Sequence, residues 1–197
     1  MKIEAKVLEN RFVRLEPMGE GHREELREAC DADQEIWPAL YPFSWAGEHF
    51  DPTWKTLTAH IAEGRTVGFA VVVKGRCVGL TCFSGMDATS GVTEIGGTYY
   101  RPEFRGGAVN PAAKRLMMGH AFESGARRVV YRVDALNVRS RAAVSKLGAV
   151  QEGVLRQDRV TWTGRVRDTV IFSVLDAEWP QVRDGLDARL AGFGADR

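Results

Sequence analysis

The sequence predicts an α/β domain built on a mixed β-sheet, and three observations lead to this prediction. Residues 66–101 alternate apolar and polar positions in runs separated by turns, which is typical of a β-meander. Residues 111–175 then alternate segments of helical and strand periodicity and end in two consecutive strands. The chain has 197 residues, of which 44% are apolar, so it is long enough for one domain with a substantial core.

The N-terminal part is predicted to form a strand, a helix, an aromatic loop and a second helix. Alternating polar and apolar residues favour a strand within residues 7–18, and a single apolar stripe favours a helix over 19–30. Residues 36–45 contain two prolines among closely spaced aromatic residues, so we expect an irregular loop there. An Asp-Pro pair typical of a helix start precedes a helix expected over 52–63.

From residue 66 onward the apolar pattern has a period of two. Strands over 66–73 and 76–84 flank a Lys74-Gly75 turn, and a strand over 92–101 completes the meander. The remaining predicted elements are, in order, a helix over 111–123, a strand over 128–134, a helix over 138–147, strands over 150–160 and 167–175, and a closing helix over about 177–191.

The charge balance argues against nucleic acids and membranes as partners. The chain carries 27 Lys and Arg residues against 26 Asp and Glu residues, so it has no net field that would attract nucleic acid or anionic lipid. Its longest nearly apolar stretch, residues 67–73, is far shorter than the roughly 20 residues that span a bilayer. The N-terminus is too charged for a signal peptide, and we expect a cytoplasmic protein.

The cysteine and histidine residues indicate neither a disulfide framework nor a metal site. Cys30, Cys77 and Cys82 are odd in number and sparse, so we expect them to be small buried apolar residues. The four histidines lack the spacing of paired zinc ligands. We therefore expect no bound metal.

A basic, glycine-rich loop joins the third meander strand to the next helix. Gly106 and Gly107 let backbone amides turn outward, Arg105 adds positive charge, and Asn110 is expected to cap the helix. Together with the helix dipole, these groups favour an anion the size of a pyrophosphate. A tight turn with a surface arginine is the alternative that the spacing allows. The sequence contains neither a G-x-x-x-x-G-K-S/T loop nor a G-x-G-x-x-G fingerprint, which argues against P-loop and dinucleotide folds.

The order of several motifs along the chain resembles the GNAT family of acetyl-CoA-dependent N-acetyltransferases. The motifs are E-I-G at residues 94–96, N-x-x-S at 137–140, K-L-G-A at 146–149, E-G at 152–153 and R-D-T at 167–169. Over roughly residues 5–180 the resemblance is strongest to the ribosomal-protein N-terminal acetyltransferase (RimJ/RimL-like) branch. It implies that residues 1–197 form a single domain with the GNAT fold. That fold has a mixed, mostly antiparallel sheet of about seven strands, flanked by helices and splayed between the fourth and fifth strands.

The resemblance also implies acetyl-CoA as cosubstrate. The glycine-rich loop would hold its pyrophosphate, and the helix after Asn137 would lie along its pantetheine arm. Asn137 is able to pair with pantetheine amides and also to cap that helix. The residues implied in coenzyme binding are Tyr99, Tyr100, Arg105, Gly106, Gly107, Ala108, Val109, Asn110, Asn137, Ser140 and Arg141.

The chain departs from the family pattern at two places. Ala108 stands where a glycine is expected, and a negative φ at Ala108 would keep its amide available. The segment from Glu94 to Arg105 is one residue longer than in many relatives, and we expect Gly96-Gly97 to absorb that residue in a β-bulge that opens the sheet.

The resemblance assigns the candidate catalytic residues. Glu94 would accept the proton of the attacking amine through water, the alternative being a solvated strand carboxylate. Ser140 would protonate the departing thiolate or contact the coenzyme, the alternative being a local backbone hydrogen bond. Val144 stands where many family members carry a tyrosine acid, so no tyrosine acid is carried over.

The free energy of amine deprotonation narrows the acceptor. At pH 7 an α-amine costs roughly 1.4 kcal/mol to deprotonate and a lysine side chain roughly 4.6 kcal/mol. A water-mediated base therefore favours a protein or peptide N-terminal α-amine, or a small α-amine, which would attack directly in a ternary complex. Trp37, Tyr41 and Trp45 are expected to wall the acceptor site or to pack in the core.

Three questions stay open from the sequence. The same donor-site motifs fit an antibiotic or metabolite acetyltransferase, because a fold does not determine a substrate. They also fit a noncatalytic acyl-CoA-binding or interaction module. A homodimer is possible through the terminal strands and helix.

Overall fold

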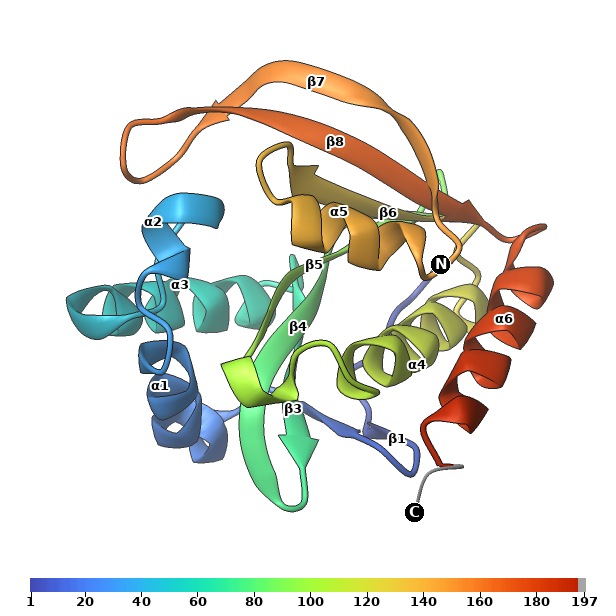
Figure 1. The fold of residues 1–197 in the computed structure, drawn as a ribbon, viewed down its shortest axis with the longest axis horizontal. Coiled ribbons are helices and arrows are strands. Elements are labelled where there is room, and N and C mark those ends of the chain that lie inside the picture. Colours follow the sequence, from blue (N-terminus) through green and yellow to red (C-terminus); the bar gives the residue numbers. More distant parts are fainter. Residues whose placement is uncertain (195–197) are drawn as a thin grey trace.

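The computed structural model describes residues 1–194 and shows an open eight-stranded sheet in the order β1-β2-β3-β4-β5-β6-β8-β7 (Figure 1). The strands are β1 (Leu8–Glu9), β2 (Arg14–Pro17), β3 (Val67–Val73), β4 (Arg76–Asp87), β5 (Val92–Tyr100), β6 (Arg128–Asp134), β7 (Val150–Val160) and β8 (Val166–Leu175). The α-helices are α1 (Arg23–Asp31), α2 (Ile36–Leu40), α3 (Phe50–Ala62), α4 (Val109–Glu123), α5 (Val138–Ser145) and α6 (Trp179–Gly192). The predicted α/β class, meander and closing helix are confirmed.

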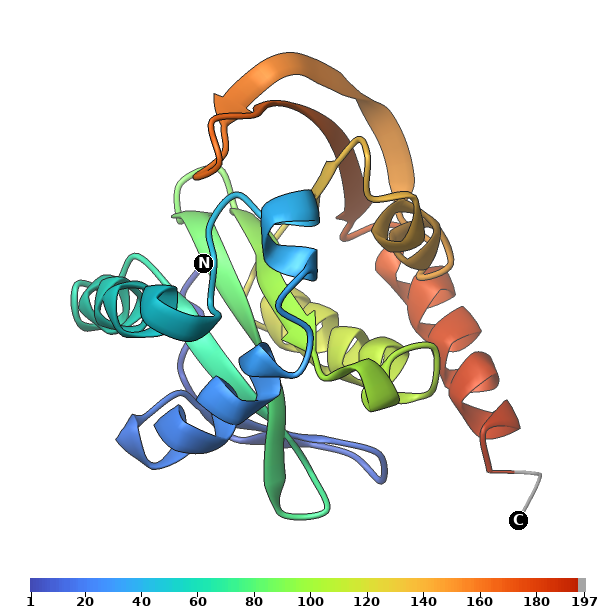
Figure 2. The same ribbon diagram turned by 60° about the vertical axis from the view of Figure 1, so that its left-hand side comes forward.

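Helices cover both faces of the sheet (Figures 1 and 2). Along β3, Phe69 and Val71 pack in one core cluster with α4 and α6, whereas Ala70 and Val72 pack in a second cluster with α1, α2 and α3. The strand is therefore buried on both faces, which explains its nearly continuous apolar sequence.

The sheet is mixed because β5 and β6 run parallel while the other neighbouring strands are antiparallel. The parallel pairing covers only Val92–Glu94 against Arg128–Val130. Beyond Glu94, β6 continues alongside β8, and β5 continues alongside β4. The sheet is thus splayed between these two strands, as the family resemblance implied.

Two local predictions were wrong. The predicted first strand is divided into β1 and β2, because the Asn10 side chain accepts hydrogen bonds from the amides of Phe12 and Val13 and closes a turn. The predicted aromatic loop contains the short helix α2, which accommodates Pro38 in its first turn, where a backbone N–H has no intrahelical partner.

Within residues 1–194, no helix combines the length and the apolar character needed to cross a membrane.

Candidate functional site

A cavity of about 620 Å³ lies at the fork between β5 and β6. The fork begins at a bulge in β5: Leu80 pairs with Tyr99 and Cys82 pairs with Gly96, so Thr81 faces two residues. Gly97 occupies the bulge at φ +57°, a conformation that strains residues with a Cβ. The predicted bulge is therefore confirmed, and it turns the end of β5 away from β6.

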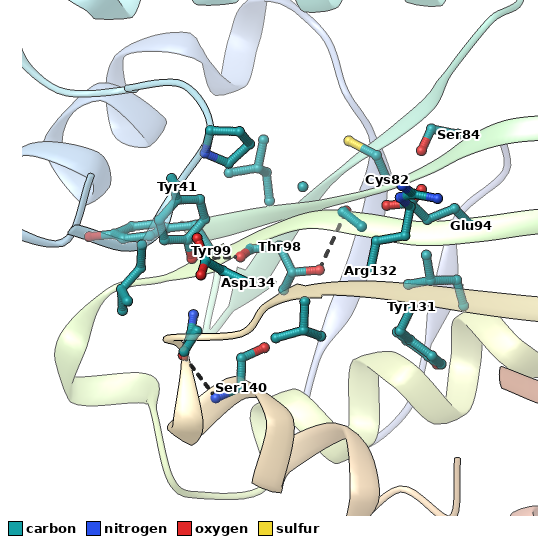
Figure 3. Close-up of a pocket in the computed structure, with 18 of the residues that line it drawn as sticks. Tyr41, Cys82, Ser84, Glu94, Thr98, Tyr99, Tyr131, Arg132, Asp134 and Ser140 are labelled. Carbon is teal, nitrogen blue, oxygen red and sulfur yellow. Dashed lines mark hydrogen bonds between the residues drawn. The ribbon is translucent and has the colours of Figure 1, made fainter. Parts of the chain in front are cut away.

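Glu94 is the last residue of β5 that pairs with β6, and its side chain lines the cavity (Figure 3). Burial raises the pKa of its carboxyl, and the nearby guanidinium groups of Arg132 and Arg159 oppose that shift. A Cβ at Gly96 would lie 2.6 Å from Oε1 of Glu94. The glycine therefore leaves the space that the carboxylate occupies beside the strand.

The glycine-rich loop leads from β5 into α4. Gly106 adopts φ +79°, and Ala108 adopts φ −71°, so the alanine is unstrained, as expected. Ala108, and not Asn110, is the N-cap residue of α4, so the predicted cap was wrong: the helix begins one residue before Asn110. The first amides of α4 have no intrahelical acceptor and form a site suited to an anion.

Arg105 is held in place by several contacts. Its Nη1 atom forms an ion pair with Asp33, its Nε atom donates to the Tyr100 carbonyl at 2.7 Å, and its guanidinium lies 5.1 Å from the centre of the Tyr99 ring. These contacts fix the guanidinium where the loop meets the cavity. Part of its charge is already neutralised by Asp33, which sequence reasoning did not anticipate.

Two residues at the start of α5 line the opposite wall. The Asn137 side chain accepts a hydrogen bond from the Ser140 amide at 2.9 Å and caps the helix. Among residues 1–194, the amide nitrogen of that side chain has no acceptor and is available as a donor. The Ser140 side chain also lines the cavity near the open end of the fork (Figure 3).

The predicted coenzyme residues divide into two groups. Those that line the cavity are Tyr99, Tyr100, Arg105, Gly106, Asn110, Asn137 and Ser140. Gly107, Ala108, Val109 and Arg141 lie outside its lining. The side chain of Val109 packs in the core, and Arg141 donates to the Ala135 carbonyl at 3.3 Å.

The three aromatic residues predicted near the acceptor have different positions. Trp37 is fully buried, packs 4.6 Å from both the Tyr41 and Tyr99 ring centres, and does not line the cavity. Tyr41 and Trp45 do line it. The Tyr41 hydroxyl donates to the Thr98 carbonyl at 2.9 Å, and burial raises its pKa to about 12, so it remains protonated at neutral pH.

Sequence reasoning missed a buried cation beneath the bulge. Lys114, on α4, extends its ammonium group to the hydroxyls of Thr81 and Thr98 at 2.9 and 2.6 Å. Burial lowers the pKa of Lys114 to about 7. No sequence signal marked this contact, because it joins residues far apart in the chain.

Tyr131 was also missed. This residue of β6 lines the cavity, and its buried hydroxyl has no hydrogen-bond partner within residues 1–194. Tyr131 is therefore one of several hydroxyl-bearing residues, besides Ser140, that line the cavity. Among the same residues there is no group of three or more side chains suited to hold a metal ion.

Comparison with known proteins agrees with this geometry. Residues 13–150 match the family model described as "Acetyltransferase (GNAT) domain". No curated protein matches the chain. A GCN5-related N-acetyltransferase from Brucella melitensis is 32% identical, with a TM-score of 0.84, covering 95% of this chain and 86% of its own. A putative acetyltransferase from T. thermophilus is also 32% identical, with a TM-score of 0.84 and coverage of 96% and 100%.

A more distant structure shares the fold. Mycobacterium smegmatis RimJ, solved in complex with CoA-disulfide, is 23% identical, with a TM-score of 0.78 over 90% of this chain and 88% of its own. The family match and the two closer structures together establish the relationship. The chain therefore belongs to the GNAT family of acetyltransferases, which use acetyl-CoA as the acetyl donor.

Proposed function

We propose that this protein, as a single domain, transfers the acetyl group of acetyl-CoA to a primary α-amine by direct attack in a ternary complex. One observation carries the proposal: the Glu94 carboxylate, at the β5–β6 fork, lines a cavity whose other end meets the first turn of α4 at Asn110. A base for an amine and a site for a phosphate anion thus share one cavity.

The donor half of the cavity fits the coenzyme. Past Glu94 the edge of β5 that faces β6 has no strand partner within residues 1–194, so its backbone groups are available to the amide-rich pantetheine arm. Asn137 and Ser140 would contact the same arm, and the first turn of α4 with Arg105 would hold the pyrophosphate. The likeness to RimJ, which was solved with a coenzyme A disulfide, supports this assignment.

The acceptor half contains the candidate base. The acceptor nitrogen forms a bond to the acetyl carbon, the carbon–sulfur bond breaks, and the nitrogen loses a proton. Glu94 would take that proton through a water molecule, and its raised pKa suits it to this role. Ser140 would return a proton to the departing thiolate, and Tyr131 is another hydroxyl-bearing residue that lines the cavity. An α-amine needs less assistance than a lysine side chain because its pKa is lower.

The branch and the cellular setting belong to the same proposal. The motif order supports a place near the ribosomal-protein N-terminal acetyltransferases, and the fold shared with RimJ is consistent with it. The proposed setting is the cytoplasm. Within that proposal the acceptor is a protein N-terminus or a small α-amine.

Calorimetric titration with acetyl-CoA, with ATP and NADH as controls, tests the donor site. We expect acetyl-CoA to bind and ATP and NADH not to bind. Release of coenzyme A is then followed with α-amine and lysine-only acceptors, and we expect faster release with the α-amines. Coenzyme binding without release in the presence of any amine would favour a noncatalytic acyl-CoA-binding module, and faster release with lysine would contradict the α-amine assignment.

A further inference from the structure

A second group of cations lies at the end of the cavity near Glu94. Arg132 on β6, Arg159 on β7 and Arg167 on β8 all line the cavity and all lie close enough to influence the Glu94 carboxyl. Arg159 and Arg167 are direct cross-strand neighbours, and Arg132 points towards Glu94 in Figure 3. By contrast, Arg105 and Arg139 lie near Tyr41, at the end where α4 and α5 begin. The proposed phosphate site at that end therefore has cations separate from those near Glu94.

The aspartates of this region do not neutralise all of its guanidinium groups. Asp158 accepts two hydrogen bonds from Arg132, at 2.8 and 3.0 Å, and one from Arg159 at 3.1 Å. Asp134 is buried and bonds to Arg165. Arg167 therefore has to share carboxylates that other arginines already occupy.

Among the arginines near Glu94, Arg167 has the weakest contact with a carboxylate. It is buried, and its hydrogen bonds go to the Thr169 hydroxyl at 3.1 Å and the Arg132 carbonyl at 3.4 Å. The Oδ2 atom of Asp134 lies 3.7 Å from its Nε atom, and within residues 1–194 no carboxylate is within hydrogen-bonding distance of Arg167. Asp134 pairs with Arg167 only at this longer distance, because it is bonded to Arg165, so a ligand carboxylate in the cavity would supply the close anionic partner that Arg167 lacks.

We propose that the acceptor is a free α-amino acid, whose carboxylate binds Arg167 and Arg159 while its amine faces Glu94. This inference rests on the proposed acetyltransferase function. An α-amino acid carries a cationic amine and an anionic carboxylate on one carbon, which matches the carboxylate and the guanidinium groups across the fork. A peptide N-terminus lacks this anion because its α-carboxyl group is part of an amide. Arg167 would then keep only its long ion pair with Asp134.

Matched acceptors test the proposal directly. The initial rate of coenzyme A release is measured with the common amino acids, with their C-terminal amides and with ethylamine, and binding of each acceptor to the protein–coenzyme A complex is followed by calorimetry. The amide amine is less basic, so chemistry alone would favour the amide. We expect kcat/KM to be roughly 10- to 100-fold higher for the best amino acid than for its amide, the effect of one hydrogen bond to a charged group.

Variants of Arg167 test whether this residue causes the preference for the amino acid over its amide. Arg167→Gln should remove most of the preference for the acid, and Arg167→Lys should retain part of it. Arg156→Gln, at an exposed arginine of β7, is the matched control and should keep the full preference. Acetyl-CoA affinity and melting temperature are measured for each variant to show that it is folded. If Arg167→Gln does not fold, the ratio of kcat/KM for the acid to kcat/KM for the amide in the wild type still tests the proposal.

The outcomes separate the two proposals. Turnover of amides at rates equal to or above those of the acids overturns the amino-acid assignment and leaves acetyl transfer standing. Coenzyme binding with no turnover of any amine contradicts the proposed function. If no carboxylate-bearing amine binds or reacts, the amino-acid assignment is overturned as well.

Discussion

The ammonium nitrogen of Lys114 lies 2.6 Å from the hydroxyl oxygen of Thr98, directly beneath the bulge that opens the fork. Thr81 is bonded to both, at 2.9 Å from Lys114 and 2.8 Å from Thr98. Hydroxyl groups solvate a charge without neutralising it, so burial disfavours the ammonium form of Lys114.

This arrangement predicts that the protein becomes more stable as the pH rises above about 7. The pKa of Lys114 falls from 10.5 to about 7 on folding, so between these values the unfolded chain binds more protons than the folded one. The free energy of unfolding should then rise by up to about 1.4 kcal/mol per pH unit between the two pKa values. Below the lower pKa, the full destabilisation from burying the charged Lys114 is present.

Lys114→Met should remove this dependence, because the two threonine hydroxyls remain bonded to each other. Urea unfolding at several pH values between about 6 and 9 measures the pH dependence of the free energy of unfolding. Lys55→Met, at an exposed lysine, is the control. Parallel stability curves for the wild type and Lys114→Met would show that the lysine is not buried in the way described.

Gly96→Ala should slow acetyl transfer with little effect on stability. A methyl group at this position would lie 2.6 Å from Oε1 of Glu94, and the flexible carboxylate would have to move. We expect kcat to fall roughly tenfold or more, because a displaced base loses its reach to the amine.

The glycine variants are compared by their kinetics and by their melting temperatures. Gly153→Ala is the control, since a Cβ there meets nothing within 4 Å. An unchanged kcat in Gly96→Ala would show that the position of Glu94 does not limit the reaction.

Trp37→Phe should lower stability and leave the acceptor KM unchanged. Trp37 is fully buried, and its Nε1 atom donates to the Cys30 carbonyl at 3.1 Å. Loss of ring volume and of this hydrogen bond should cost about 1–3 kcal/mol of unfolding free energy. Chemical denaturation measures the free energy of unfolding, and steady-state kinetics measure the acceptor KM. A raised acceptor KM at unchanged stability would indicate that Trp37 contributes to the acceptor site and would contradict the prediction.

Much of the fold could be predicted because local patterns agree with the tertiary structure. The apolar run at residues 67–73 and the helical stripe of α1 predicted a strand and a helix that the folded chain forms, although β3 is buried on both faces instead of alternating. The prediction failed where one residue changed the local geometry. The Asn10 side chain closes a turn inside an otherwise strand-like segment, and Pro38 fits a helix of a single turn.

The site could be predicted only in part, for a different reason. The glycine-rich loop and the cap at Asn137 are local features, and sequence reasoning reached both. The contact between Lys114 and Thr81 joins α4 to β4, and the shared carboxylate of Asp134 joins β6 to β8. Such contacts depend on how distant segments pack, which residue spacing along the chain does not encode.

The central claim is that Glu94 acts as the base for acetyl transfer from acetyl-CoA to an amine. Amine-dependent release of coenzyme A by the wild type and Glu94→Gln, with acetyl-CoA affinity measured for both, tests it most directly. We predict a fall in kcat of roughly 100-fold, partly recovered at high pH where more of the amine is neutral, and an acetyl-CoA Kd that changes less than about twofold. A Glu94→Gln variant as fast as the wild type, at normal coenzyme affinity, would contradict the claim.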